Sequence, residues 1–155
     1  MGRQLWLLRH GDAEPHGARE DSARELTPRG VDQSRAAGRA LQTLAGAFDA
    51  VYTSPKVRAV QTAEHACEAL GGTPIVHQPL ASGFGLRDAQ ELLESVDDGG
   101  RVLVVGHEPD FSQVVHDMTG ARADVKKGGI AGVRTDGTLN ELIVLLRPRE
   151  IERIK

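Results

Sequence analysis

The chain has 155 residues, with 19 basic and 22 acidic side chains and a formal net charge of -3. This length suits one domain with a substantial core, and the slightly acidic balance gives no overall attraction to nucleic acid or to an anionic membrane. The single cysteine, Cys67, excludes an internal disulfide and fits a reducing compartment. The apolar run at residues 5–8 is too short for a signal peptide or a membrane span, so we expect a cytoplasmic protein.

The first expected strand covers residues 4–9 and ends in the sequence Arg9-His10-Gly11. An apolar run that stops at a cation, an imidazole and a glycine is typical of a buried strand that delivers functional side chains into a tight turn. The polar segment 16–25 follows and predicts a surface loop.

Two helices are expected to begin with the same signal, a hydroxyl side chain that caps the helix followed by a proline in the first turn. Thr27 caps the first of them, which ends near Gly46. Ser54 caps the second, which covers residues 55–70. A short strand at residues 49–53 separates the two helices.

The second half of the chain continues the alternation of strands and helices. A strand at residues 74–77 precedes an amphipathic helix over about 86–96. The run of Val and Leu at 101–107 indicates a strand that is buried on both faces, as in the middle of a parallel sheet. The remaining expected elements are a helix from about 110 to 119, closing strands at 129–134 and 139–147 joined by an Asp-Gly turn, and a peripheral charged tail at 148–155.

This alternation predicts a single α/β domain, residues 1–155, with a mostly parallel central sheet and an antiparallel edge. The two strands that precede His10 and His107 end alike, with an apolar run and a glycine beside the histidine. In open α/β sheets, ligands bind at the carboxyl ends of the strands. We therefore expect the two histidines to share one site.

Arg58 lies in the first turn of an expected helix, where a positive charge opposes the helix dipole unless an anion binds nearby. Arg9 and Arg58 together offer forked donors that match a phosphoryl group, and helix N-termini add backbone N–H groups. With two imidazoles beside them, the expected ligand is a dianionic phosphoryl group. No spacing of His, Cys or acidic residues resembles a metal site, and the nucleotide-binding glycine patterns are missing from the sequence.

Four blocks of sequence, in the same order, resemble the histidine phosphatase superfamily. They are Leu8-Arg9-His10-Gly11, Leu26-Thr27-x-x-Gly30, Thr53-Ser54-Pro55 with Arg58-Ala59-x-Gln61-Thr62-Ala63, and Val105-Gly106-His107-Glu108-Pro109. The resemblance covers about the whole chain and is strongest to the small phosphohistidine phosphatases of the SixA type. It implies a three-layer α/β/α sandwich similar to phosphoglycerate mutases, with about six strands and without a lid insertion.

By this resemblance, His10 is the nucleophile that attacks phosphorus, and water then hydrolyses the phosphohistidine intermediate. Arg9 and Arg58 would bind the phosphoryl oxygens, and His107 would donate to them during the transfer. Arg24 aligns with an arginine that lines the pocket in the SixA branch, although composition alone also fits a solvated loop charge. The resemblance implies neither a metal nor a cofactor.

The identity of a general acid is open. Residues 78–87 are too few to form the long insertion that carries an acid in relatives acting on phosphate esters. Glu108 follows His107 and is a possible general acid, but a carboxylate at the start of a helix also compensates the helix dipole, and we favour that role. Asp12 and Glu14 are weaker candidates, because their positions are typical of turn residues.

A site without a strong acid favours a labile substrate, because a protonated imidazole leaves from an N–P bond more readily than an alkoxide leaves from an ester. The expected function is therefore metal-independent hydrolysis of phosphohistidine on a phosphotransfer or signalling protein. The alternatives are a phosphomonoesterase of small phosphorylated metabolites, a less favoured mutase in the same pocket, and a non-catalytic module that binds phosphorylated proteins. Lys126 and Lys127 are expected in a solvated loop.

Overall fold

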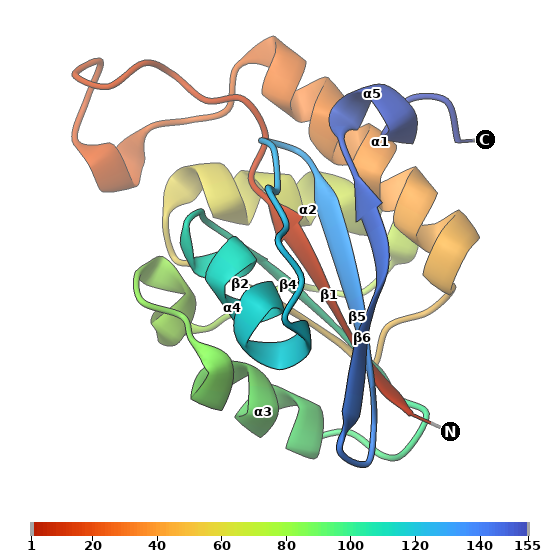
Figure 1. Cartoon of the computed structure of the whole chain (residues 1–155). Helices are drawn as coiled ribbons and strands as arrows, with labels where there is room; N and C mark the ends of the chain where they lie inside the picture. The colour runs from red at the N-terminus through yellow and green to blue at the C-terminus, as the bar shows by residue number, and fades with distance from the viewer. Residues whose placement is uncertain (1, 155) are drawn as a thin grey trace.

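The computed structural model describes residues 2–154 and contains one six-stranded sheet (Figure 1). The strands are β1 Arg3–Arg9, β2 Ala50–Thr53, β3 Ile75–Val76, β4 Arg101–Gly106, β5 Ile130–Asp136 and β6 Leu139–Leu146. The helices are α1 Pro28–Ala45, α2 Val57–Leu70, α3 Leu86–Glu94, α4 Asp110–Thr119 and α5 Pro148–Ile151, with short 3-10 turns at Asp21–Ala23 (η1) and Gln78–Ala81 (η2).

The sheet has the strand order β3-β2-β4-β1-β5-β6. Pairing is parallel among β3, β2, β4 and β1, and antiparallel from β1 to β5 and from β5 to β6. The expected parallel centre and antiparallel edge are thus confirmed. Because Arg9 pairs with Gly106 at the carboxyl ends of β1 and β4, the residues that follow each strand emerge side by side.

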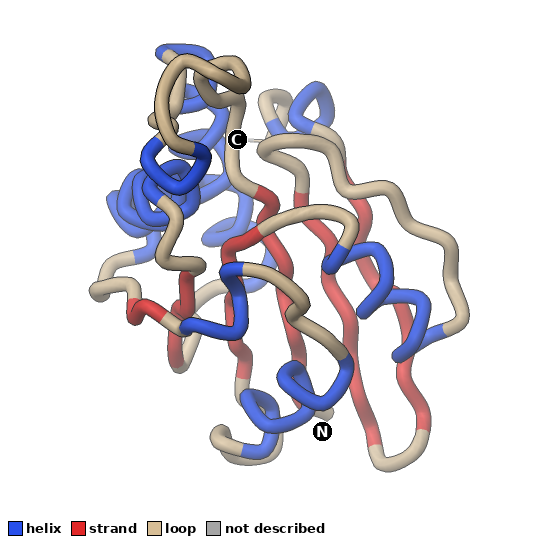
Figure 2. The backbone as a smooth tube through the Cα atoms, turned by 90° about the vertical axis from the view of Figure 1, so that its left-hand side faces the viewer, coloured by secondary structure: helices blue, strands red, loops and turns tan. Residues whose placement is uncertain are grey.

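Helices cover both faces of the sheet, which confirms the three-layer sandwich. Figure 2, turned by 90°, shows the strands lying between the two helical layers. Successive side chains of β1 alternate between these layers, as a strand requires. Leu5 and Leu7 are buried with apolar residues of α3 and α4, whereas Trp6 and Leu8 are buried with those of α1, α2 and α5. Full burial of one such leucine contributes about 1.5–3 kcal/mol, so β1 anchors both halves of the core.

The start of α1 follows its expected signal. Thr27 Oγ1 accepts a hydrogen bond from the backbone N–H of Gly30 at 3.1 Å, and Pro28 occupies the first turn. The helix ends at Gly46, whose φ of 80° favours glycine. The expectation at α2 is wrong, since its N-cap residue is Lys56 and no side chain caps it. Ser54 Oγ accepts from the Lys56 N–H and faces a different partner, described below.

The C-terminal tail is only partly peripheral, which corrects the expectation for residues 148–155. Ile151 in α5 is 1% exposed and packs in the apolar layer that contains α1. The charged C-terminal segment therefore still places one apolar side chain in the core. This anchor holds α5 against α1 (Figure 1).

The connection between β3 and α3 is short, as expected for a fold without a lid insertion. It consists of η2 and a few further residues, and its Leu80 and Phe84 are buried in the layer of α3 and α4. The segment therefore contributes to the core instead of extending away from it. Across residues 2–154, no helix has the length and apolarity needed to cross a membrane.

Candidate active site

His10 follows β1 directly and is held by its backbone and its ring. Its N–H donates to the carbonyl of Gly106, and its Nδ1 lies 2.8 Å from the carbonyl oxygen of Gly11. A carbonyl can only accept, so Nδ1 carries the proton and Nε2 keeps its lone pair. The ring is 6% exposed, and this burial, helped by the nearby charges of Arg58 and Arg9, lowers the pKa of His10 to about 4. The imidazole is therefore neutral at pH 7.

The turn after His10 packs tightly against α1 and α2. A Cβ added to Gly11 would lie 2.6 Å from the carbonyl oxygen of Gly30, which leaves no room for a side chain at Gly11. The Gly11 N–H donates to Thr62 Oγ1 at 3.1 Å, and that hydroxyl donates to the carbonyl of Arg58 at 2.7 Å. Three of the sequence blocks thus meet at one turn, which gives a physical reason for their joint occurrence.

His107 follows β4 and lies beside His10, with 5.2 Å between the ring centroids. Its Nε2 is 2.8 Å from Ser54 Oγ, which explains why Ser54 does not cap α2. Burial is the main cause that lowers the pKa of His107 to about 3, followed by the proximity of His10, Arg58 and Lys56. Both rings are consequently neutral bases in a positively charged setting.

Arg58 and Arg24 are both buried and are held by one carboxylate, that of Asp21 in η1. Arg58 Nη1 donates to the Asp21 carbonyl at 2.7 Å, and its Nη2 lies 3.4 Å from Asp21 Oδ2. Arg24 donates from Nε and Nη2 to Asp21 Oδ1 at 3.2 and 2.9 Å. These contacts, first of all that of Arg24, lower the pKa of Asp21 to about 2. Sequence reasoning missed Asp21, because nothing in a polar loop shows which cations its acid will meet.

Arg9 extends from the end of β1 and donates from Nη1 to the carbonyl of Val125 at 3.0 Å. Among residues 2–154, the buried side-chain nitrogens without a hydrogen-bond partner are the Nε atoms of Arg9, Arg58 and Arg101. A buried donor without a partner is costly, and most native proteins contain few. Two of these three donors belong to the residues expected to bind a phosphoryl group.

A cavity of about 250 Å³ joins these side chains. Its cations outnumber its acids, and burial around it strengthens their attraction for an anion. All six predicted site residues contribute to its wall. The lining residues are Arg9, His10, Ala13, Glu14, Pro15, His16, Arg24, Lys56, Arg58, His107, Glu108 and Lys127.

The acidic residues near the cavity already have structural partners. Glu108 accepts from the N–H groups of Ser112 at 2.7 Å and Val125 at 3.3 Å, which is the helix-start role favoured above. Asp12 Oδ2 accepts from the Thr27 hydroxyl at 2.7 Å. Glu14 accepts from the backbone N–H of Glu25, and this bond is the main cause that lowers its pKa. These carboxylates are therefore engaged as hydrogen-bond acceptors within the protein.

Lys126 and Lys127 lie in an exposed loop before β5, as expected, and this loop also brings Lys127 to the wall of the cavity. The Gly128 N–H donates to the carbonyls of both Arg9 and His10, and the Arg9 N–H donates to Gly129. These bonds fix the loop against the turn that carries His10. Lys126 lies outside this cavity. Within residues 2–154, no three His, Cys, Asp or Glu side chains are grouped so that they could hold a metal ion.

The geometry agrees with the comparisons to known proteins. The model of the histidine phosphatase superfamily (branch 1) matches residues 5–82, which include the turn of His10 and both Arg24 and Arg58. Phosphohistidine phosphatase SixA of Escherichia coli K12 is 31% identical over 74% of this chain and 73% of its own length. The chain belongs to the histidine phosphatase superfamily.

Two further proteins match nearly the whole chain. An uncharacterized protein of Picosynechococcus sp. strain PCC 7002 is 34% identical over 94% of this chain and 97% of its own length. The solved structure of the protein histidine phosphatase SixA complexed with tungstate superposes with a TM-score of 0.82 and 28% identity, covering 96% of this chain and 99% of that one. The chain is thus a SixA-like member of the superfamily in both sequence and fold.

Proposed function

We propose that this protein hydrolyses phosphohistidine on a phosphotransfer or signalling protein, with His10 as the nucleophile. The observation that carries the proposal is the state of His10, a neutral imidazole with Nδ1 bonded to Gly11 and Nε2 unprotonated, beside a cavity rich in cations. A fixed tautomer with a free lone pair is what a histidine nucleophile needs.

In the first step, His10 Nε2 attacks phosphorus, a new N–P bond forms, and the N–P bond to the substrate imidazole breaks. Arg9 and Arg58 hold the phosphoryl oxygens in line for this transfer, and the buried Arg24 adds positive charge to the cavity. His107, whose ring is fixed by Ser54, donates a hydrogen bond to the transferring group. In the second step, water attacks the phosphorus, phosphate leaves, and His10 returns to its neutral form.

The acids near the cavity support a substrate with an easily cleaved bond. Asp12, Glu14 and Glu108 all use carboxylate oxygens to accept hydrogen bonds from the protein, so each is already committed to a structural contact. A substrate imidazole that is already protonated leaves without a proton donor, whereas an ester alkoxide requires one. This supports phosphohistidine over phosphate esters, and the similarity to the phosphohistidine phosphatase SixA of E. coli points the same way.

The charge of the cavity also supports catalysis without a metal ion. Arg9, Arg24, Lys56, Arg58 and Lys127 surround it, and arginine forks match phosphoryl oxygens in geometry as well as in charge. The positive groups that lower the pKa values of both histidines would be balanced by a bound dianion. Binding of the phosphoryl group therefore relieves the electrostatic cost of assembling the site.

The test supplies a phosphohistidine protein, acetyl phosphate and p-nitrophenyl phosphate to wild type, His10→Ala and His116→Ala. His116 is an exposed histidine of α4 and serves as the matched control. We expect rapid hydrolysis of the phosphohistidine protein and an acid-labile phosphoenzyme in wild type and in His116→Ala, and neither in His10→Ala. Faster turnover of p-nitrophenyl phosphate than of phosphohistidine would favour a phosphomonoesterase, and binding without turnover of any of the three would favour a non-catalytic module.

A further inference from the structure

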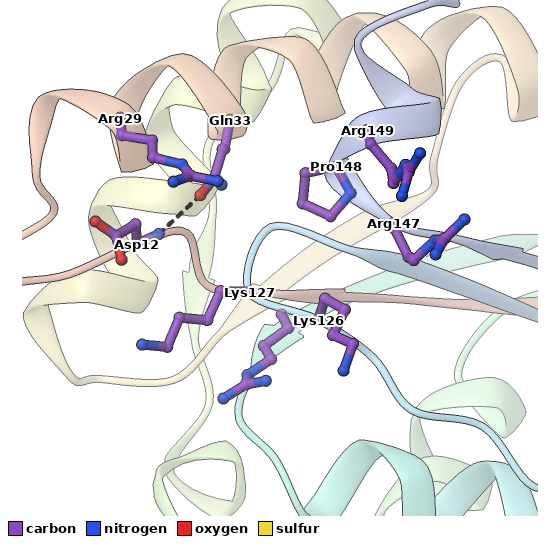
Figure 3. A pocket seen from close by; sticks show the side chains of 9 residues that line it. Asp12, Arg29, Gln33, Lys126, Lys127, Arg147, Pro148 and Arg149 are labelled. Atoms are coloured by element: carbon purple, nitrogen blue, oxygen red, sulfur yellow. Dashed lines mark hydrogen bonds between the residues drawn. The ribbon is translucent and has the colours of Figure 1, made fainter.

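A second cavity, of about 480 Å³, adjoins the cavity of about 250 Å³ beside His10, which we call the inner cavity, and shares Arg9 and Lys127 with it. Figure 3 shows the side chains that line the second cavity, which come from α1, from the turn after β1, from the loop before β5 and from the start of α5. We call it the outer cavity. Its lining residues are Arg9, Asp12, Arg29, Gln33, Lys126, Lys127, Arg147, Pro148 and Arg149.

The outer cavity is strongly basic, with six cationic residues and a single acid in its lining. That acid, Asp12, already accepts from the Thr27 hydroxyl. Lys126 pairs with Asp124, and Glu150 pairs with both arginines of the α5 segment. Within the part of the chain that the structure describes, no ion pair is formed by Arg29 or by Lys127. An uncompensated positive potential therefore lies directly beside the inner cavity.

Arg29 is the most informative of these residues. It lies in the first turn of α1, where the helix dipole disfavours a cation, and that turn contains no acid to offset it. Its side chain is exposed and has no partner that would explain the position structurally. A cation held where it slightly destabilises its own helix is consistent with a role in binding an external anion.

The chemistry of the lining indicates what kind of anion fits. No aromatic residue is available to stack on a base, and Pro148 is the one apolar residue in the wall. The side chains of Lys126 and Arg149 are 55% and 73% exposed, so these charges lie at an accessible rim and not in a closed binding site. Long, mobile surface cations suit carboxylates on another protein, which they attract and orient without a single fixed geometry.

We propose that the outer cavity binds acidic side chains that neighbour the phosphohistidine on a protein substrate. The choice of a protein substrate rests on the proposed function. Because the two cavities share Arg9 and Lys127, one macromolecule can place its phosphoryl group in the inner cavity and its carboxylates in the outer one. The specificity is thus for phosphohistidine within an acidic surface.

The test compares two phosphohistidine peptides of equal length, one with four flanking glutamates and one with four flanking glutamines. The enzyme variants are wild type, Arg29→Glu/Arg149→Glu and the control Arg87→Glu. Arg87 occupies the same second position of α3 that Arg29 has in α1, is also exposed, and lines neither cavity. Phosphoramidate, which is too small to reach the outer cavity while bound at His10, reports on the chemistry alone.

For wild type and Arg87→Glu, we expect a KM for the glutamate peptide about tenfold below that for the glutamine peptide, a difference that shrinks as salt is raised. Arg29→Glu/Arg149→Glu should lose this preference with an unchanged kcat and unchanged turnover of phosphoramidate. Equal KM values for the two peptides in wild type would overturn the proposal. So would a preference that the double variant retains.

A binding measurement separates this inference from the proposed function. A fluorescent, unphosphorylated glutamate peptide is titrated with His10→Ala and with His10→Ala carrying the two charge reversals, and anisotropy reports binding without turnover. Binding that depends on the two arginines supports the outer cavity even if wild type hydrolyses no phosphohistidine. If instead fructose 1,6-bisphosphate binds in an arginine-dependent manner and the glutamate peptide does not, the outer cavity accepts small bisphosphates and the proposal is overturned.

Discussion

The inner and outer cavities share two residues but are built on opposite principles. The inner cavity takes its chemistry from buried side chains at the ends of β1, β4 and the start of α2, each fixed by hydrogen bonds. The outer cavity takes its charge from exposed lysines and arginines of α1, the loop before β5 and α5, which pair with solvent-facing acids or with none. In our proposals, the buried and hydrogen-bonded cavity selects the reacting group, and the exposed cavity selects the acidic surroundings of that group.

The largest effect should come from His10→Ala, which tests the inner cavity as the place of reaction. Without the nucleophile, kcat for phosphohistidine should fall by at least about 10³-fold, because the two-step route is lost. Rapid-quench detection of the phosphoenzyme, together with steady-state rates, measures this. A variant that kept substantial turnover would move the nucleophile to another residue.

Arg58→Ala should follow in magnitude. Arg58 is buried and charged, so its loss should weaken phosphate or vanadate binding by about 1.5–3 kcal/mol, the scale for a hydrogen bond to a charged group. Isothermal titration of vanadate provides the measurement. Arg29→Ala, in the outer cavity, should change the same constant less than twofold, and equal losses in the two variants would remove the distinction between the cavities.

The protonation of the two histidines predicts how stability depends on pH. Their pKa values in the folded protein are about 4 and about 3, below the ordinary value of 6.5. Between pH 6.5 and 4, the unfolded chain therefore binds protons at these two histidines, whereas the folded protein does not. The free energy of unfolding should fall as the pH decreases over this range, in total by about 1.4 kcal/mol for each unit of pKa difference. The loss of stability is complete only below the folded pKa values.

Urea unfolding at pH 7, 6, 5 and 4 measures this dependence. The double variant His10→Asn/His107→Asn should lose less stability over that range than wild type, since it lacks the two groups that titrate. Asp21, whose pKa is lowered from 3.8 to about 2, begins to lose its own contribution to stability near pH 4, but both proteins contain Asp21 and share this loss. If the free energy of unfolding fell equally in the two proteins as the pH decreased, groups other than His10 and His107 would account for the loss of stability in acid.

The smallest of these effects is expected for Asp21→Asn, which should lower kcat/KM about tenfold. The backbone carbonyl of Asp21 still accepts from Arg58, but the charged anchor for Arg24 and Arg58 is lost. The change should appear mainly in KM, because the two arginines are less well oriented for the phosphoryl group. If Asp21→Asn instead improved binding by releasing the arginines, Asp21 would be a competitor of the substrate and not a positioning residue.

Much of the inner cavity is predictable from sequence because its residues follow local rules. The apolar runs before His10 and His107 place both rings at the carboxyl ends of neighbouring parallel strands. Thr27 begins α1 where a capping hydroxyl before a proline predicts a helix start. Such signals lie within a few residues of the feature that they predict.

The errors arise where a contact distant in sequence decides the outcome. Ser54 carries the same local signal as Thr27, but its hydroxyl meets His107, 53 residues away. Asp21 meets Arg58, 37 residues away, and Ile151 finds the core although charged residues surround it in sequence. A capping or composition rule contains no information about such partners, which the parallel sheet and its crossovers bring together.

The close approach of Gly11 to Gly30 has a consequence for how this fold can diversify. With the bridge between Ala13 and Leu26 and the bond from the Thr27 N–H to the Asp12 carbonyl, it ties the two ends of the intervening loop together. We therefore expect that residues 14–25 can lengthen or shorten without moving His10, the proposed nucleophile. This loop carries both Asp21 and Arg24, so changes in its length offer a route to new substrate preferences while the position of His10 stays the same.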